Sequence, residues 1–271
     1  MDNRPIGVFD SGLGGLTAVK ELIRILPQEN IVYFGDTGRV PYGSRSRDTI
    51  IRYATQDIAF LRSKQVKIVI AACGTVSSVA QDIGDHLPVP FTGVLGPTAA
   101  AAAAATKSGR IGVIGTTATI RSGSYRRELA KRNPSLAIFE QDCPLFVPLV
   151  ENGFVAEDEV VTRLVAERYL APLKEQNIDT LIMGCTHYPI IRHILSRVMG
   201  QEVTLIDSGR ETALYAAKLL EQQGLLCDGS QKSHLQFYVS DQVEGFSSIA
   251  KLFLEQDIGP RVAQVDINRF S

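Results

Sequence analysis

The chain has almost no net charge. Its 28 Lys and Arg residues are balanced by 29 Asp and Glu residues, which leaves a formal charge of −1. Proteins that bind nucleic acids or anionic membranes through surface charge usually carry a basic excess or a basic patch. The charged fraction of 21% beside 45% hydrophobic residues also excludes long disordered or coiled-coil regions. We therefore expect a globular protein that binds neither nucleic acid nor a membrane.

Segments typical of secretion or membrane insertion are also lacking. The first seven residues, MDNRPIG, do not combine a basic region with an apolar stretch, so no signal peptide is predicted. Residues 87–106 carry no charge, but Pro88, Pro90 and Pro97 interrupt them. Seven consecutive alanines at 99–105 add little hydrophobicity, so this stretch is not expected to span a bilayer.

Cysteine is scarce and its spacing predicts no disulfide scaffold. The four cysteines form no CxxC pair, which indicates a reducing cytoplasm and free thiols. No spacing typical of zinc ligands is found, so no metal is expected. The residues considered as zinc ligands, all of which lack such spacing, are Cys143, Cys227, His86, His193 and His234. Cys143 and Cys227 lack a glycine turn beside them and are interpreted as structural.

Short apolar runs alternate with segments of helical periodicity. The runs lie at 6–9, 31–34, 68–71, 111–114, 180–183 and 203–206. They do not alternate apolar with polar residues, which is typical of strands buried on both faces of a parallel sheet. Helical periodicity at 16–26, 49–63 and 157–176 predicts a doubly wound α/β fold. Active sites in such folds lie beyond the carboxyl ends of the strands.

The residues that follow the predicted strands repeat between the two halves of the chain. The first strand of each half leads into Asp10-Ser11-Gly12 or Gly115-Thr116-Thr117. Another strand of each half leads into Cys73-Gly74-Thr75 or Gly184-Cys185-Thr186-His187. This pattern favours a duplicated unit and two similar lobes that face each other.

The boundary between the lobes is expected at 94–97. Pro97 suits the first position of a helix, which the alanines propagate and Ser108-Gly109 end. After Asp207 we expect a helix at 210–223, a loop at 224–233, a strand at 235–239 and a final helix. The sequence pattern of this segment is compatible with either lobe.

Cys73 and Cys185 are the strongest candidates for chemistry. An unpaired cysteine is usually a small buried hydrophobe, but two at equivalent strand ends favour a function. The start of a helix is expected to lower the pKa of such a thiol. Two thiols across a small cleft do not both ionise readily, so the pair should rest as one thiolate and one thiol. Such a pair can remove a proton from one face of a carbon and return one to the other.

Two loops and one further pair of residues leave alternatives open. The glycine-rich loop at 9–16 fits neither a Walker A loop nor GxGxxG. Asp10 or Ser11 could cap the next helix, or the loop could hold an anion while Asp10 binds a cation or assists a base. The loop at 36–43 is expected to form a pocket wall. Cys185 and His187 could instead be an acyl-transfer pair, which would leave Cys73 unused.

Taken together, these motifs resemble the glutamate racemases of the cofactor-independent aspartate/glutamate racemase superfamily. The matching segments occur in order along nearly the whole chain, at 10–16, 34–37, 40–43, 73–75, 115–119, 143–144, 150–153 and 184–189. The resemblance implies two pseudo-symmetric doubly wound lobes, residues 1–96 plus 209–271 and residues 97–208, with the active site in the cleft between them. It implies racemisation of glutamate without pyridoxal phosphate or any other cofactor, supply of D-glutamate for peptidoglycan, and a homodimer.

The resemblance also assigns roles to individual residues. Cys73 would serve the D-enantiomer and Cys185 the L-enantiomer as proton donor and acceptor, with Asp10, Glu151 and His187 as catalytic auxiliaries. By its local sequence alone, Glu151 is interpreted as an acid in a surface loop. The implied substrate-binding residues are Asp10, Ser11, Pro41, Tyr42, Gly43, Gly74, Thr75, Thr116, Thr119, Thr186 and His187. No lysine follows these strand ends, which fits a mechanism without a Schiff base.

One position departs from the family pattern. Where the family usually has Cys-Asn-Thr, this chain has Gly74 between Cys73 and Thr75. The missing amide removes a hydrogen-bond donor and acceptor beside the reacting carbon, a loss of about 1–3 kcal/mol if nothing replaces it. Three alternatives stay open: a racemase of aspartate or another amino acid, a Cys–His hydrolase that uses Cys185 and His187, and a non-catalytic glutamate-binding relative whose site is impaired at Gly74.

Overall fold

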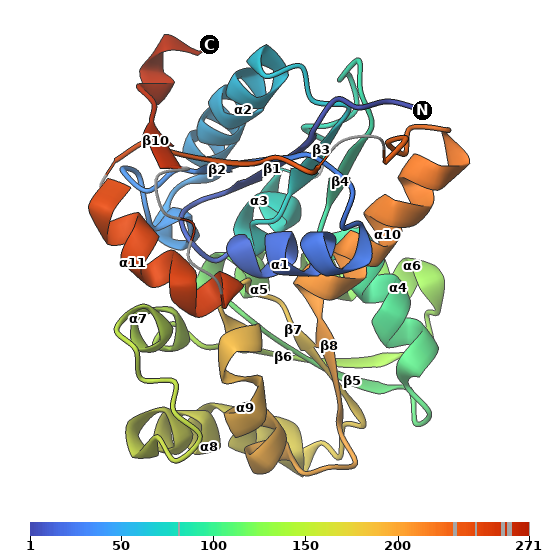
Figure 1. The fold of residues 1–271 in the computed structure, drawn as a ribbon. Coiled ribbons are helices and arrows are strands. Elements are labelled where there is room, and N and C mark those ends of the chain that lie inside the picture. Colours follow the sequence, from blue (N-terminus) through green and yellow to red (C-terminus); the bar gives the residue numbers. More distant parts are fainter. Residues whose placement is uncertain (81, 230–231, 242, 256–257, 259–261, 271) are drawn as a thin grey trace.

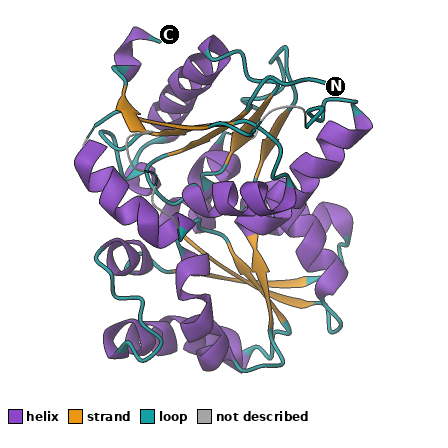
Figure 2. Cartoon of the chain, in the orientation of Figure 1, coloured by secondary structure: helices purple, strands orange, loops and turns teal. Residues whose placement is uncertain are grey.

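Two parallel sheets, each covered by helices on both faces, form the fold (Figures 1 and 2). The computed structural model describes the chain except residues 81, 230–231, 242, 256–257, 259–261 and 271. The six-stranded sheet has the order β10-β9-β2-β1-β3-β4 and the four-stranded sheet the order β6-β5-β7-β8. The strands are β1 (Ile6–Asp10), β2 (Ile31–Gly35), β3 (Ile68–Ala71), β4 (Phe91–Gly93), β5 (Arg110–Gly115), β6 (Ala137–Asp142), β7 (Thr180–Met183), β8 (Thr204–Asp207), β9 (Leu235–Val239) and β10 (Val262–Gln264).

The two sheets repeat one strand order. In the first, β2-β1-β3-β4 follow one another, and in the second, β6-β5-β7-β8 do so in the same relative order. The expected α/β fold with two similar parallel sheets is therefore confirmed, and the six strands predicted from apolar runs lie within one residue of β1, β2, β3, β5, β7 and β8. Because the order is the same, the turns after β1 and β5 are equivalent, as are those after β3 and β7.

Helices connect the strands. The α-helices are α1 (Leu16–Ile25), α2 (Arg47–Ser63), α3 (Gly74–Val79), α4 (Leu95–Ala105), α5 (Thr117–Ser122), α6 (Ser124–Arg132), α7 (Phe146–Glu151), α8 (Val160–Glu175), α9 (Arg192–Met199), α10 (Ser208–Gln222) and α11 (Val243–Leu254). Short 3₁₀ turns lie at Tyr42–Ser44, Tyr188–Ile191 and Ile267–Arg269. In the described part of the chain, no helix combines the length and apolarity needed to cross a membrane.

The alanine-rich helix α4 begins two residues earlier than expected. Pro97 is its third residue rather than its first. Proline is tolerated there because the N–H groups of the first turn have no partner inside a helix. The helix ends at Ala105, before the expected stop at Ser108.

One continuous apolar core joins the two sheets. Val8 of β1 and Met183 of β7 belong to the same buried cluster, with residues of α1, α10 and α11. Separate clusters fill the other face of each sheet. Strand β9 pairs with β2 and lies between β2 and the edge strand β10 of the six-stranded sheet, while α10 packs against both α1 and α4. The lobe boundaries at 96/97 and 208/209 stay a prediction.

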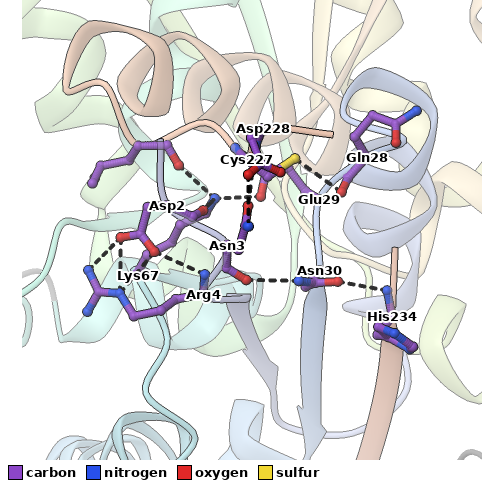
Figure 3. Close-up of polar contacts among 11 residues, drawn as sticks. Asp2, Asn3, Arg4, Gln28, Glu29, Asn30, Lys67, Cys227, Asp228 and His234 are labelled. Atoms are coloured by element: carbon purple, nitrogen blue, oxygen red, sulfur yellow. Dashed lines mark hydrogen bonds and ion pairs between the residues drawn. The ribbon is translucent and has the colours of Figure 1, made fainter. Parts of the chain in front are cut away.

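A buried polar cluster, here called the amino-end clamp, ties distant segments together at the start of β3 (Figure 3). The Nζ atom of Lys67 lies 2.6 Å from Oε2 of Glu29 and donates to the carbonyl oxygens of Asp2 and Leu225, each at 2.6 Å. Oε1 of Glu29 accepts from the backbone N–H of Cys227 at 2.9 Å. The clamp therefore joins the N-terminal residues, β3 and the segment that follows α10.

Candidate active site

The carboxyl ends of the two sheets border a single cavity of about 790 Å³. Turns from both lobes line it, as expected for parallel α/β sheets. Of the residues assigned from the resemblance, those in its wall are Ser11, Pro41, Tyr42, Gly43, Cys73, Gly74, Thr75, Thr116, Glu151, Cys185, Thr186 and His187. Asp10 and Thr119 are buried and lie outside the wall.

Cys73 is a buried thiol in an anionic environment. It directly precedes α3, and its Sγ donates to the Ser11 hydroxyl at 3.5 Å. Burial, together with the nearby Asp10 carboxylate, raises the pKa of Cys73 to about 12. The predicted lowering of the pKa by the helix start is therefore wrong at Cys73. Helix α3 has only six residues, and its N-terminus does not offset the loss of solvation and the neighbouring negative charge.

Cys185 has a cationic neighbour instead. Its Sγ lies 3.9 Å from Nδ1 of His187, and Nε2 of His187 lies 2.9 Å from Oε1 of Glu151. Burial opposes charge on the imidazole, but the interactions with Cys185 and Glu151 outweigh it and raise the pKa of His187 to about 10. His187 is therefore an imidazolium at neutral pH. The ring of Phe253 in α11 packs edge-on against it, with the centroids 5.4 Å apart.

Glu151 is held in place by secondary structure. It is the last residue of α7, and the end of that helix directs its carboxylate toward His187. The surface-loop interpretation of its local sequence is therefore wrong. Cys185, His187 and Glu151 form a hydrogen-bonded row, which can hold a proton on the imidazole beside the sulfur.

Asp10 supports the site from behind the cavity wall. Its Oδ2 accepts the backbone N–H of Gly12 at 3.0 Å and so closes the glycine-rich loop. Helix α1 begins at Leu16 without a side-chain cap, so neither Asp10 nor Ser11 caps it. Burial raises the pKa of Asp10, while the positive charge of His187 acts in the opposite direction. The charge of Asp10 therefore affects the pKa of Cys73 and is itself affected by His187.

The threonines connect the two lobes across the cavity. The Thr75 and Thr116 hydroxyl oxygens are 3.2 Å apart, and Thr116 donates to the Thr119 hydroxyl at 3.0 Å. The Thr116 hydroxyl also accepts from the Thr119 N–H at 3.3 Å and caps α5. At the turn that follows β7, the Thr186 carbonyl accepts a hydrogen bond of 3.0 Å from the Thr17 hydroxyl of α1. Thr119 thus positions Thr116, which is the residue in the wall.

Tyr42 borders the cavity, but its hydroxyl is hydrogen-bonded inside the first lobe. The phenol donates to the carboxylate of Asp36 and is 3.1 Å from Oδ2 of Asp57, inside the first lobe. Arg39 bridges the same two carboxylates at 2.5 and 3.1 Å. Burial, reinforced by Asp36, raises the pKa of Asp57 well above its ordinary value. The Tyr42 hydroxyl is therefore committed to this buried network and is unavailable to a ligand.

Two arginines in the wall were not anticipated from the sequence. Arg45 follows the 3₁₀ turn of the first lobe, and Arg121 lies in α5 of the second. Both are exposed, so they lie at the rim, and neither forms an ion pair with any residue that the structure describes. No motif distinguishes them from ordinary surface arginines. Cys143, interpreted as structural, is buried but also borders the cavity, and burial raises its pKa.

No metal centre accompanies these groups in the described residues. Within those ranges, no cluster of three or more His, Cys, Asp or Glu side chains has an arrangement that could hold a metal ion. The polar groups that border the cavity are thiols, hydroxyls, backbone amides, one imidazolium, one carboxylate and two guanidiniums. This set suits proton transfer and recognition of an anion.

Comparison with known proteins agrees with this geometry. The profile of the Asp/Glu/Hydantoin racemase family matches residues 7–216. A glutamate racemase of Chlorobaculum tepidum is 48% identical over 256 residues, which cover 94% of this chain and 93% of that protein. The crystal structure of Francisella tularensis glutamate racemase with D-glutamate covers 100% of both chains, at 38% identity and a TM-score of 0.92. A Bacillus anthracis glutamate racemase covers 98% of both chains, at 36% identity and a TM-score of 0.93. The chain therefore belongs to the Asp/Glu/Hydantoin racemase family, and with it to the isomerases.

Proposed function

We propose that this protein interconverts L- and D-glutamate by cofactor-independent proton transfer between its α-carbon and the thiols of Cys73 and Cys185. The observation that carries the proposal is the pair of buried thiols at equivalent strand ends of two facing sheets, both open to one cavity. The glutamate racemases at 36–48% identity, one of them solved with D-glutamate, support the substrate. We further propose a cytoplasmic homodimer that supplies D-glutamate for peptidoglycan.

The two sulfurs have neighbours of opposite charge. The His187 imidazolium, 3.9 Å from the sulfur of Cys185, stabilises a negative charge there. Burial and the nearby Asp10 carboxylate raise the pKa of Cys73, so it rests as a thiol. One thiolate and one thiol are the two protonation states that a two-base racemisation needs at its start.

The reaction then proceeds as two balanced proton transfers. The Cys185 thiolate takes the α-proton of L-glutamate, which breaks the C–H bond, forms an S–H bond and leaves the electron pair on the α-carbon and carboxylate. Cys73 delivers its proton to the opposite face and becomes the thiolate, which releases D-glutamate. Hydroxyls and backbone N–H groups of the strand-end turns, those of Thr75 and Thr186 among them, stabilise the charge that develops on the carboxylate. The reverse reaction starts from the opposite protonation state.

Incubation with L-glutamate, and separately with D-glutamate, in heavy water without added cofactor tests the proposal. Loss of the α-proton is followed by NMR and inversion by polarimetry. We expect deuterium at the α-carbon and convergence on a racemic mixture from both sides. A binding protein would bind glutamate without exchange, and a Cys–His hydrolase would form an acyl intermediate that does not need Cys73. If the protein racemises aspartate or another amino acid in preference to glutamate, the proposed substrate is wrong and the reaction type stands.

Replacing Glu151 by glutamine is expected to lower the pKa of His187 from about 10. The substitution removes the carboxylate 2.9 Å from Nε2 that stabilises the imidazolium. NMR titration of the His187 ring measures the midpoint directly. The control is Glu157→Gln, which removes an exposed carboxylate that pairs with Arg197. Equal His187 midpoints in wild type and Glu151→Gln would contradict the role of Glu151.

The same pKa shift makes a prediction for stability. The pKa of folded His187 lies above the ordinary value of 6.5, so the folded state holds this proton more tightly than the unfolded chain. The resulting stabilisation is complete below pH 6.5 and is lost as the pH rises through about 10. Urea unfolding across this range should therefore show a decline that is smaller in Glu151→Gln.

Neutralising Arg45 and Arg121 together by glutamine is expected to lower kcat/KM about tenfold at low ionic strength, mainly through KM. Glutamate carries a net negative charge, and the two rim guanidiniums attract it from opposite lobes. The difference from wild type should shrink as salt is added, because exposed charges are screened. The control is Arg47→Gln, whose exposed side chain pairs with Asp82 and lies outside the wall. A loss that is independent of salt would contradict electrostatic attraction.

A further inference from the structure

The two thiol-bearing turns approach each other closely at a pair of glycines. Gly74 follows Cys73 at the start of α3, and Gly184 precedes Cys185 after β7. A Cβ added to Gly74 would lie 2.4 Å from the carbonyl oxygen of Gly184 and 3.8 Å from the Cα of Cys185. Real Cβ atoms essentially never come within 3.0 Å of another heavy atom in this way. At this separation of the lobes, only glycine fits at position 74.

The obstacle opposite Gly74 is backbone that is anchored in the second lobe. The N–H of Gly184 donates to the carbonyl of Ile114 in β5 at 2.8 Å. A Cβ added to Gly184 itself would lie 2.7 Å from that same carbonyl oxygen and 3.1 Å from the ring of Tyr125. The Gly184 carbonyl therefore cannot rotate away as a flexible side chain would. A side chain at position 74 must displace the whole turn that carries Cys185.

The other side of this turn is equally close to the first lobe. A Cβ added to Gly14 would lie 2.1 Å from Oγ1 of Thr186 and 2.6 Å from Nδ1 of His187. The hydrogen bond from Thr17 to the Thr186 carbonyl joins the lobes at the same place. The Cys185 turn is thus held between the glycine-rich loop and the Cys73 turn. Displacement at Gly74 consequently changes the positions of both Cys185 and His187.

We propose that Gly74 is a positioning residue that sets the separation between the two thiols in this chain. The Gly184 carbonyl occupies the space into which the Cβ of the asparagine in a Cys-Asn-Thr motif would project. The proposal rests on the proposed function, because thiol separation limits turnover only if both thiols transfer protons. Its consequence is opposite to the simple expectation from the motif: an asparagine at position 74 impairs this enzyme instead of restoring a lost contact.

The test compares Gly74→Ala and Gly74→Asn with wild type and with Gly96→Ala. The added Cβ in the control would lie 4.0 Å from the Arg132 guanidinium, at ordinary contact distance. In heavy water we expect inversion to fall on the order of 100-fold in both Gly74 variants, as for a catalytic group misplaced by about 1 Å. Exchange of the α-proton without inversion should fall less, because it needs only one thiol. The proposal is overturned if Gly74→Asn inverts glutamate as fast as wild type. It is also overturned if the Gly74 variants lose exchange and inversion by the same factor.

A second measurement needs no turnover. A short bifunctional alkylating reagent is applied to the substrate-free proteins, and peptide mass spectrometry measures the yield of the Cys73–Cys185 bridge. We expect a lower yield in both Gly74 variants than in wild type and Gly96→Ala. Equal yields in all four proteins overturn the proposal. If wild type neither exchanges nor inverts glutamate, the proposed function fails, and the bridging yield still decides whether Gly74 sets the thiol separation.

Discussion

Cys73→Ser is expected to slow the inversion of both glutamate enantiomers by about 10⁴-fold, and Cys185→Ser to do the same, which is the upper range for loss of a positioned acid or base. Each thiol serves one face of the α-carbon, and a serine hydroxyl is a far weaker acid than a thiol. L- and D-glutamate have equal free energies in an achiral solvent. The two directions must therefore lose the same factor in kcat/KM, whichever thiol is replaced.

The two serine variants should differ in what they retain. Cys73→Ser keeps Cys185 beside the His187 imidazolium, so it should still exchange the α-proton of L-glutamate slowly without inverting it. Cys185→Ser should show the mirror-image behaviour with D-glutamate. Cys227→Ser is the matched control, because Cys227 lies in the amino-end clamp, outside the cavity wall. Inversion within tenfold of wild type in either active-site variant would refute the two-thiol mechanism.

Lys67→Met is expected to lower the free energy of unfolding by about 3–5 kcal/mol, the usual cost of leaving one partner of a buried ion pair alone. The side chains of Lys67 and Glu29 are 0% and 2% exposed, so water cannot replace the lost ammonium. The carbonyls of Asp2 and Leu225 also lose a donor. Urea unfolding monitored by circular dichroism measures the change.

Two variants identify the cause of that loss. Adding Glu29→Leu to Lys67→Met removes the unpaired carboxylate and should restore part of the stability. Arg163→Met breaks an exposed pair with Glu167 and should cost at most about 0.5 kcal/mol. A cost below about 1 kcal/mol for Lys67→Met would mean that the Glu29 carboxylate finds another partner or becomes protonated.

The strands that could be predicted contain a short apolar run, and their limits are sharpest where the run is buried on both faces. Runs such as 68–71 and 180–183 coincide with β3 and β7 because a central parallel strand leaves no polar alternation to obscure its limits. Strand β6 escaped prediction because its second half, Glu140, Gln141 and Asp142, is polar and only partly buried. Strands β4 and β10 have three residues each, too few for a pattern.

The positions of the site residues were more predictable than their electrostatics. Strand ends in a parallel sheet meet at one edge, so the turns at Cys73 and Cys185 could be expected to share a cavity. The raised pKa of Cys73 could not be predicted, because it depends on burial and on Asp10, a residue from a different strand end. The commitment of the Tyr42 hydroxyl to Asp36 and Asp57 is likewise a contact made only by the folded chain.

The repeated strand order has a consequence for stereochemistry. A planar carbanion has two faces, and a half-turn about an axis in its plane exchanges them. Conversion of one enantiomer into its mirror image uses both faces. Two copies of one strand arrangement that present equivalent turns to each other match this requirement by construction. What the repeat cannot provide is a difference between the faces. That difference comes from unlike neighbours, Asp10 near Cys73 and His187 beside Cys185, so the proposed reaction combines a nearly symmetric frame with an asymmetric arrangement of charges.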